Sequence, residues 1–292
     1  MKKVIAIVGP TASGKTKLSI EIAKRIQGEI INGDSVQVYQ GLDIGSAKIR
    51  SEEMEGIHHH LLSICDPKNT YSVFNFQKDA RYLIEKIEHP VIVGGTGLYI
   101  KAALYDYEFV ESKRSIDFES QYENYSNQEL YDLLMMKDPG VKIDLNNRRR
   151  LIRALEQAMF GEPRSKKTKK DLVLYDTLII YLDLDRNILN ERLRFRLEKQ
   201  IEEGFLDEVY QLKQENIEIN AIGYRELSQH LDGLLSLDEA KEQIIIHSRQ
   251  LAKKQKTWFK NQMNPWMIDA LDEHLIEKVY NRIKDFLKED NA

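Results

Sequence analysis

Residues 9–16 read Gly9-Pro10-Thr11-Ala12-Ser13-Gly14-Lys15-Thr16, a complete match to the phosphate-binding pattern G-x-x-x-x-G-K-[ST]. The apolar run Val4–Val8 before it is typical of a buried parallel strand, and apolar residues recur at helical spacing after it. A strand, a glycine loop and a helix in this order aim backbone N–H groups and the positive end of a helix at one point. The sequence therefore predicts a diphosphate or triphosphate site, with Lys15 on the outer phosphate oxygens and the Thr16 hydroxyl offered to Mg²⁺.

The composition is that of a globular protein. The chain has 292 residues, 42% of them hydrophobic and 31% charged, which suits one large domain or two moderate ones. The formal net charge of −4 argues against a general nucleic-acid binder unless positive charge is gathered locally. Cys65 is the only cysteine, which fits a reducing compartment. The apolar run that begins after Lys3 is too short for a signal peptide or a membrane span, so we expect a cytoplasmic protein with no membrane association.

Strand-like and helix-like patterns alternate through the first hundred residues, as βαβ units do. Further strands are predicted at Glu29–Asn32 and Val91–Val93, and Thr177–Leu182 is predicted to return to the same sheet. Between these regions the sequence becomes polar, charged and helical. We therefore predict an α/β fold, a P-loop NTPase-like parallel sheet flanked by helices, formed by residues 1–107 and 172–292 with C-terminal helices. Residues 108–171 are predicted to form a helical insertion domain.

Polar residues follow two of the predicted strands. Asp34-Ser35 follows the strand at 29–32, and Gly94-Gly95-Thr96-Gly97 follows the strand at 91–93. Ligands gather at the carboxyl ends of strands in open α/β sheets, so both segments should lie beside the phosphate loop. Asp34 could support magnesium indirectly, act as a general base toward a second substrate, or cap a turn or helix. The glycine cluster fits a tight strand-to-helix turn nearly as well as a ligand contact.

Positive charge is gathered in two segments. The first, between Lys142 and Lys170, has few acids and contains Arg148, Arg149, Arg150, Arg153, Arg164, Lys166, Lys167 and Lys169. The second, between Glu242 and Asp269, has no acid at all, and the capping box Ser236–Glu239 predicts a helix through it. One face of that helix carries Arg249, Lys253, Lys256 and Lys260. Such a stripe is usually a solvated face, but on a chain of net negative charge it also indicates a polyanion surface.

Two further motifs leave alternatives open. His58-His59-His60 invites a zinc site, yet consecutive histidines cannot readily point one way and no Cys or spaced His completes a ligand set, so we expect a surface or pocket loop. Arg192 and Arg196 stand one helical turn apart. They either belong to an amphipathic helix or reach over the phosphate site, as arginines of mobile lobes do in phosphoryl transfer.

With these residues in view, the chain resembles the tRNA dimethylallyltransferases along nearly its whole length. The motifs that carry the resemblance are the phosphate loop, Asp34–Tyr39, Asp43–Lys48, His59–Leu61, Val93–Tyr99, Arg149–Glu156, Ala221–Leu227, Ser248–Gln255 and Thr257–Phe259. A phosphate loop alone would be shared with many kinases, whereas the ordered set is far more specific. Departures are small: His58 stands where the family usually has Pro, Ser46 where Thr is common, and His247 where Thr is usual.

The resemblance implies transfer of a dimethylallyl group from its diphosphate to the N6 amine of an adenosine. That adenosine lies immediately 3′ to the anticodon, at position 37, in tRNAs that read codons beginning with U. By family match Asp34, Thr96 and Arg196 are the catalytic residues: Asp34 is the base, Thr96 contacts the target nucleotide and Arg196 assists at the diphosphate. The diphosphate would lie on Gly9, Thr11, Ala12, Ser13, Gly14, Lys15 and Thr16, with Mg²⁺ at Thr16.

The basic segments then acquire a role as a grip on the anticodon stem-loop. The residues that match tRNA-contacting positions of the family are Asp34, Ser35, Val36, Gln37, Thr96, Arg149, Arg150, Arg153, Gly223, Tyr224, Arg225, Arg249, Lys253 and Lys256. The partners implied are a tRNA anticodon stem-loop and dimethylallyl diphosphate, and we expect a monomer.

Three other functions compete with this one. A nucleotide kinase would use ATP and leave the C-terminal basic face without a role. An adenylate isopentenyltransferase would perform the same chemistry on free AMP and would need no RNA grip. A non-catalytic RNA-binding protein would have no use for a complete phosphate loop.

Overall fold

The computed structural model describes residues 1–107, 116–161, 163–166 and 172–289. The described chain divides into two compact units, Met1–Leu104 with Leu174–Ala292, and Tyr105–Val173. The predicted domain boundaries at 108 and 171 lie outside the described residues, so they stay a prediction. We describe each unit by itself.

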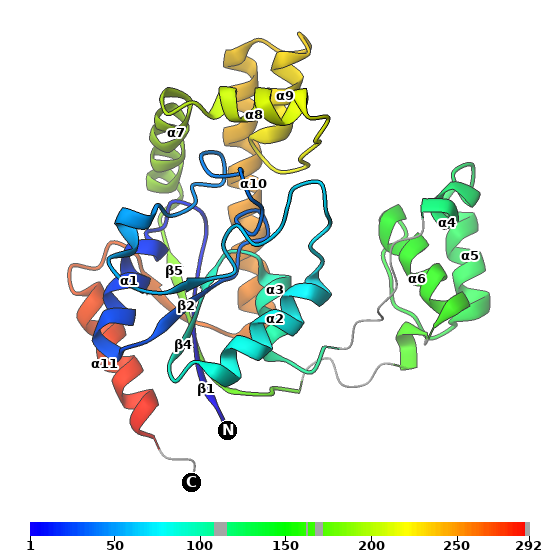
Figure 1. Ribbon diagram of the computed structural model, residues 1–292. Helices are drawn as coiled ribbons and strands as arrows, with labels where there is room; N and C mark the ends of the chain where they lie inside the picture. The colour runs from blue at the N-terminus through cyan, green and yellow to red at the C-terminus, as the bar shows by residue number, and fades with distance from the viewer. Residues whose placement is uncertain (108–115, 162, 167–171, 290–292) are drawn as a thin grey trace. The chain divides into compact units, whose positions relative to one another are not determined.

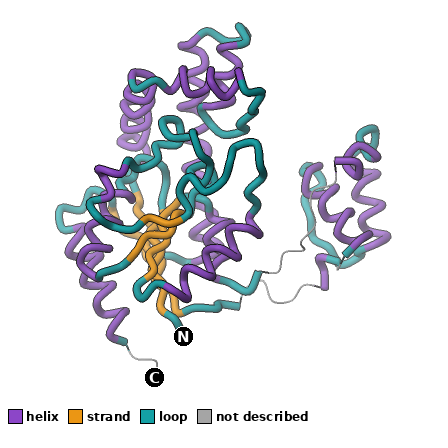
Figure 2. Tube along the Cα trace, viewed as in Figure 1, coloured by secondary structure: helices purple, strands orange, loops and turns teal. Residues whose placement is uncertain are grey.

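The larger unit is built on a six-stranded parallel sheet in the order β3-β2-β4-β1-β5-β6. The strands of this sheet are orange in Figure 2. The strands are β1 (Lys3–Val8), β2 (Glu29–Asn32), β3 (His59–His60), β4 (Pro90–Gly94), β5 (Asp176–Asp183) and β6 (Trp266–Asp269). The central strand β1 pairs with β4 and β5, which puts Ile5 opposite Val91 and Leu178. Both faces of β1 are buried, which explains its uninterrupted apolar sequence. The predicted parallel α/β core is confirmed.

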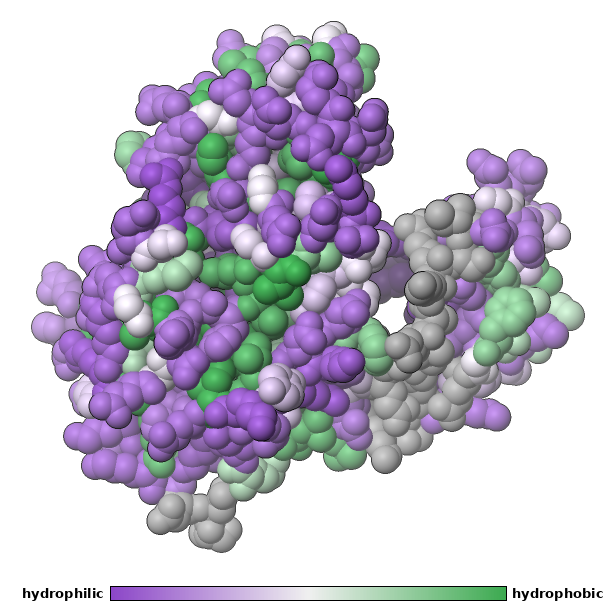
Figure 3. Space-filling model, viewed as in Figure 1, coloured by the Kyte–Doolittle hydropathy of each residue, from purple (hydrophilic) through white to green (hydrophobic). Residues whose placement is uncertain are grey.

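Helices cover both faces of this sheet (Figure 1). The helices α1 (Lys15–Ile26) and α11 (Leu275–Lys288) pack against one face through an apolar cluster that includes Leu18, Ile22, Val279 and Phe286. The other face is covered by α2 (Val73–Lys86), α3 (Gly97–Leu104) and part of α10 (Leu237–Met263). On the surface seen in Figure 3, hydrophobic residues gather in a band across the middle of this unit, and the rest is mostly hydrophilic.

A helical lobe adjoins the sheet within the same unit. It consists of α7 (Arg186–Glu202), α8 (Phe205–Gln214) and α9 (Tyr224–Leu231), packed against the first half of α10. A second apolar cluster that includes Leu193, Phe205, Leu227 and Ile244 holds these helices together. The long helix α10 runs from this lobe to the sheet. Its residues therefore lie beside both the lobe and the phosphate loop. Among the described helices, none combines the length and the hydropathy that a membrane span requires.

The smaller unit is helical. It contains α4 (Ile116–Gln121), α5 (Asn127–Lys137), α6 (Arg148–Phe160) and the 3₁₀ turn η2 (Arg164–Lys166). Its core is made by Phe118, Leu130, Leu134, Leu151 and Leu155. A capping box at Ser126 begins α5, and Gly161 follows the end of α6.

Two segments differ from the sequence analysis. We expected His58–His60 to form a loop, but His59 and His60 pair with Ile30 and Ile31 as the edge strand β3. His60 Nε2 lies 2.6 Å from Glu29 Oε2 across that edge. The strand β6 was not predicted, because its four residues follow a long helix and carry no alternation that distinguishes them from a loop.

Candidate active site

The phosphate loop has the strained backbone that its glycines permit. Gly9 and Gly14 have φ values of +150° and +92°, and a Cβ on Gly9 would lie 2.9 Å from the carbonyl oxygen of Leu182. Gly14 caps α1 without any side-chain hydrogen bond, so the first backbone N–H groups of the helix are left for a ligand. In the described part of the chain, the buried Ser13 Oγ has no hydrogen-bond partner. A loop with free amides and an orphaned hydroxyl is suited to an anion.

Lys15 lies among charges that are far apart in the sequence. Its Nζ donates a hydrogen bond to Pro10 O at 2.6 Å. Burial lowers the pKa of Lys15 to about 8; the Asp34 carboxylate opposes this shift, and the Arg196 guanidinium adds to it. Three charged groups from β2, α1 and α7 therefore meet at the phosphate loop. A bound anion would favour the charged form of the lysine.

Asp34 and Thr96 lie at the ends of β2 and β4. Asp34 Oδ1 accepts hydrogen bonds from the backbone N–H groups of Val36 at 2.8 Å and Gln37 at 3.4 Å, so one oxygen holds a turn, as one of the open alternatives supposed. In the described residues no hydrogen bond reaches the other oxygen, Oδ2. Thr96 Oγ1 accepts from Ser35 N at 3.1 Å and lies 3.3 Å from Ser35 Oγ. The sheet thus brings together the two strand ends and the phosphate loop.

The helix α7 presents two arginines toward the site. Arg196 Nη2 donates to Ser46 O at 3.4 Å, and Arg192 Nη1 donates to Ala12 O, within the phosphate loop, at 3.3 Å. Burial lowers the pKa of Arg196 below its ordinary value, and nearby Asp34 partly opposes that shift. Of the two alternatives for this pair, the arrangement fits arginines that reach the phosphate site.

A cavity of about 330 Å³ opens beside these groups. Its polar lining includes Thr11, Asp34, Ser35 and Arg196. Its apolar lining comes from α7, α8 and α10, with Leu193, Leu197, Phe205, Ile244, Ile245 and Leu251. The site therefore places cationic groups that can bind an anion, a carboxylate and a small, partly apolar cavity next to one another.

The residues at the start of α9 are held by a buried carboxylate. Glu226 Oε2 accepts from Gly223 N at 2.7 Å, and its Oε1 contacts both Arg225 Nη2 and His247 Nδ1. Burial raises the pKa of Glu226, but the Gly223 N–H, its own N–H, Arg225 and His247 outweigh burial and lower that pKa below its usual range. Gly223 has a φ of +94° and faces the Phe205 ring, while Tyr224 is buried and lines the cavity.

The basic face of α10 lines a different cavity, of about 990 Å³, together with Pro10 and Arg186. Arg249, Lys253 and Lys256 all border it. Lys256 Nζ pairs with Asp183 Oδ2 at 2.8 Å, a compensating acid from β5 that the neighbouring sequence does not contain. In the described residues the buried Nε of Arg249 has no hydrogen-bond partner.

The arginines of α6 belong to the smaller unit. Arg149 and Arg150 are exposed at the start of the helix, and Arg153 pairs with Glu156 one turn on. Arg148 instead holds the preceding segment, since its guanidinium donates to backbone carbonyls that include Glu123 O at 3.0 Å. Of these arginines, Arg149 and Arg150 are exposed on the smaller unit.

The family model for IPP transferase matches residues 37–262, more than half of the chain. The chain belongs to the IPP transferase family. It is 49% identical over 287 residues to the tRNA dimethylallyltransferase of Acholeplasma laidlawii, covering 98% of this chain and 99% of that relative. It is 44% identical to the tRNA dimethylallyltransferase of Anoxybacillus flavithermus, covering 98% and 96%. The resemblance drawn from the sequence motifs is confirmed.

Solved structures agree with this membership. The full-length tRNA isopentenylpyrophosphate transferase of Bacillus halodurans is 39% identical, covers 99% of this chain and 98% of its own, and superposes with a TM-score of 0.77. A eukaryotic dimethylallyltransferase acting on tRNA is 27% identical, covers 100% of this chain and 81% of its own, and gives a TM-score of 0.86. The phosphate loop, at 9–16, precedes the segment that the family model matches.

This IPP transferase contains site residues that the sequence analysis did not single out. Gln255 lines the smaller cavity and its Nε2 donates to Gly95 O at 2.9 Å, which fixes the turn that carries Thr96. Gln200 lines the same cavity and donates to Gly45 O at 3.1 Å. Gln255 lies within a family motif and could have been suspected for that reason. Gln200 lies on a charged helix and has no local signal.

Proposed function

We propose that this IPP transferase moves a dimethylallyl group from dimethylallyl diphosphate to the N6 amine of an adenosine in tRNA. The observation that carries the proposal is the meeting of Lys15, Arg196 and Asp34 beside a cavity whose lining is partly apolar. The family membership and the relatives that act on tRNA support the same reaction. The finer assignment, adenosine 37 in tRNAs that read codons beginning with U, rests on the family resemblance.

The diphosphate would lie on the phosphate loop. Its oxygens would accept hydrogen bonds from the free N–H groups at the start of α1 and from the Ser13 hydroxyl, which lacks a partner in the described chain. Lys15 and Arg196 would stabilise the negative charge that grows on the leaving group as the allylic C–O bond breaks. The residues proposed to hold the diphosphate are Gly9, Thr11, Ala12, Ser13, Gly14, Lys15 and Thr16.

The same loop fits a magnesium ion held mainly by the diphosphate. Thr16 is exposed at the second position of α1, where its hydroxyl is free to be a ligand. No group of three or more His, Cys, Asp or Glu side chains that could cage a metal is found among the described residues. Mg²⁺ bound with the diphosphate would neutralise charge on the leaving group.

Asp34 is proposed as the group that receives the proton from the attacking amine. The lone pair of an adenine amine is delocalised into the ring, so the amine is a poor nucleophile and gains from a carboxylate within hydrogen-bond reach. Oδ1 is occupied by the turn at Val36, which fixes the carboxylate and leaves Oδ2 to face a substrate. Thr96 is tied to Ser35 and would position the nucleotide beside it.

The apolar lining of the smaller cavity suits the five-carbon prenyl group. Leu193, Leu197 and Ile245 would surround it and exclude water, which would otherwise capture an allylic cation. The acceptor base must leave the anticodon stack to enter, at a cost of about a few kcal/mol.

Cations on α6, α9 and α10 would repay part of that cost by binding RNA phosphates. Arg149, Arg150 and Arg153 on α6, Arg225 on α9, and Arg249, Lys253 and Lys256 on α10 are proposed to hold the anticodon stem-loop. Ser35, Val36, Gln37, Gly223 and Tyr224 would shape the entrance for the base. We propose that the enzyme acts as a monomer, and a tRNA substrate is in keeping with a cytoplasmic enzyme.

The test offers the purified protein labelled dimethylallyl diphosphate and labelled ATP separately, each with tRNA or with AMP. We expect label to pass from dimethylallyl diphosphate to tRNA alone, and mass analysis of the digested tRNA to locate the modified nucleoside. Consumption of ATP would instead indicate a kinase. Equal transfer to AMP, without dependence on salt, would indicate an adenylate isopentenyltransferase.

A further inference from the structure

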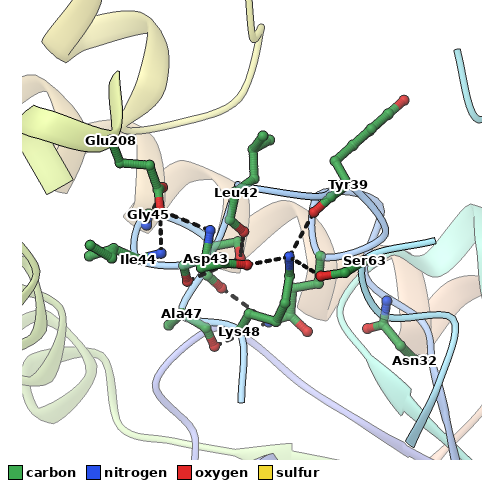
Figure 4. A network of polar contacts seen from close by, with 12 residues as sticks. Asn32, Tyr39, Leu42, Asp43, Ile44, Gly45, Ala47, Lys48, Ser63 and Glu208 are labelled. Carbon is green, nitrogen blue, oxygen red and sulfur yellow. Dashed lines mark hydrogen bonds and ion pairs between the residues drawn. The ribbon is translucent and has the colours of Figure 1, made fainter. Parts of the chain in front are cut away.

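The loop at 43–46 is fixed by a carboxylate from a distant helix (Figure 4). Glu208 on α8 accepts hydrogen bonds at Oε2 from the backbone N–H groups of Asp43 at 2.9 Å and Ile44 at 2.7 Å. Its Oε1 accepts from Gly45 N at 3.0 Å and from the Tyr224 hydroxyl at 2.6 Å. Two donors therefore reach each oxygen, which uses the full accepting capacity of an ionised carboxylate.

The other side of this loop is held just as closely. Gln200 Nε2 donates to the carbonyl oxygens of Ile44 and Gly45, the latter at 3.1 Å. A Cβ at Gly45 would lie only 2.1 Å from the Phe205 ring, so only glycine fits there. The loop is therefore fixed against α7 and α8 through its N–H groups, its carbonyls and its packing.

A second charged side chain holds the far end of the loop. The Lys48 ammonium donates to Tyr39 O at 2.6 Å and Ser63 Oγ at 2.8 Å, and pairs with Asp43 Oδ1 at 2.6 Å. Its side chain is only 6% exposed, whereas that of Asp43 is 60% exposed, so the lysine is largely covered while the ion pair borders solvent. Ser46 lies in the sequence between the amides that Glu208 holds and Lys48.

That residue, Ser46, meets the candidate active site through its carbonyl oxygen. Ser46 O accepts hydrogen bonds from Arg196 Nη2 at 3.4 Å and from Gln37 Nε2 at 3.0 Å. Both Ser46 and Arg196 line the smaller cavity, together with Asp34. The place of Arg196 relative to the phosphate loop thus depends on a carbonyl that Glu208 fixes one residue away.

We propose that Glu208 is a positioning residue for prenyl transfer, which fixes the 43–46 loop so that Ser46 O orients Arg196 toward the diphosphate. This inference rests on the function proposed above. A carboxylate is required because all four of its contacts are donors; an amide in its place would turn an NH₂ group toward two of them. Displacement of a charge-stabilising group by about 1 Å is enough to slow a reaction about 100-fold.

Glu208→Gln tests this directly. We expect kcat for transfer to tRNA to fall about 10- to 100-fold, with the Kd for tRNA changed less than about twofold. Glu215→Gln is the matched control: Glu215 follows the end of the same helix and pairs with Lys68 at the surface, away from the loop. It removes the same charge and should leave kcat unchanged. An unchanged kcat in Glu208→Gln would overturn the proposal.

A double-mutant cycle separates positioning from a general loss of structure. If Glu208 acts through Arg196, adding Glu208→Gln to Arg196→Ala should lower kcat by less than about threefold further. If the two losses multiply instead, Glu208 does not act through Arg196 and the proposal fails. Where Glu208→Gln does not fold, Glu208→Asp carries the same cycle, because it keeps the charge but is too short to reach all three amides.

A binding measurement tests the role of Glu208 independently of the proposed function. The affinity for inorganic pyrophosphate, measured by calorimetry without tRNA, should fall in Glu208→Gln, whereas adding Glu208→Gln to Arg196→Ala should lower it no further. Absence of transfer by the unmodified enzyme would end the proposed function but leave this measurement valid. Unchanged pyrophosphate affinity in Glu208→Gln would overturn the role of Glu208 at Arg196.

Discussion

The phosphate loop and the basic face of α10 both gather positive charge, but they hold it differently. Lys15 is partly enclosed, its pKa is lowered by burial, and it shares the site with Asp34 and Arg196. Lys253 is exposed beside the larger cavity, and among the described residues it makes no ion pair. The first arrangement fixes charge where a reaction would need it. The second supplies charge that can adapt to a flexible polyanion.

The difference implies that the two regions contribute to different measurable quantities. Substitutions at the enclosed charges should change turnover and leave RNA affinity alone. Substitutions on the exposed face should change RNA affinity and its salt dependence and leave turnover at saturation alone. A variant that changed both quantities strongly would contradict that division.

The largest effect is expected at the centre of the enclosed region. Lys15→Ala should lower kcat/KM for dimethylallyl diphosphate about 1,000-fold, because it removes the positive charge nearest the leaving group. The Kd for tRNA should stay within about twofold. Lys17→Ala is the control, since Lys17 is exposed on the same helix, and should be close to neutral. A large loss of tRNA affinity in Lys15→Ala would break the division.

Asp34 should come next. Asp34→Asn keeps an oxygen to accept from Val36 N and so preserves the turn, but it removes the base; we expect kcat to fall about 100-fold or more. Asp34→Ala should lose the turn as well and be worse. Turnover near that of the unmodified enzyme in Asp34→Asn, with a loss only in Asp34→Ala, would reduce Asp34 to a turn carboxylate.

On the exposed face the effect should be smaller and of another kind. Lys253→Ala should weaken all tRNAs about equally and lower the slope of log affinity against log salt by about one. Lys254→Ala removes the same charge from a different face of α10 and serves as the control. If Lys253→Ala relaxed discrimination among tRNAs, the residue would not be a simple phosphate contact.

The smallest effect concerns Glu226, which contacts Arg225 and His247. Its pKa is lowered in the folded state, so its contribution to stability is complete above the ordinary value of 4.5 and is lost as the pH falls below it. Glu226→Gln should therefore lower the Tm at neutral pH by a margin that shrinks in acid. Thermal unfolding of both proteins between pH 3 and pH 7, which brackets the ordinary carboxyl pKa, measures it. A margin that is constant with pH would contradict the assignment.

Local sequence was enough for the elements that carry strong periodicity. The strand, loop and helix over residues 3–26 lie where the phosphate motif and its flanking apolar residues predict them. The helix that begins after Ser236 could also be predicted from the sequence. The convergence of Asp34, Thr96 and the phosphate loop could be predicted too, because ligands bind at the carboxyl ends of strands in open α/β sheets and the sequence indicates where those strands end.

Side-chain contacts between residues far apart in the sequence could not be predicted from it. Glu208 reaches backbone amides more than 160 residues away, and nothing in the sequence around it distinguishes it from a solvated glutamate. Lys256 pairs with Asp183 in the same way, although its own segment contains no acid. The short strands β3 and β6 depend on pairing with neighbours rather than on their own pattern, so they too appear only in the fold.

The most direct test of the central claim is a crystal structure of the enzyme with an anticodon stem-loop and an unreactive analogue of dimethylallyl diphosphate. We expect the diphosphate on the N–H groups before α1 with Lys15 and Arg196 against it, and the adenine N6 within about 3 Å of Asp34 Oδ2. A diphosphate bound elsewhere, or Asp34 turned away from the adenine, would contradict it.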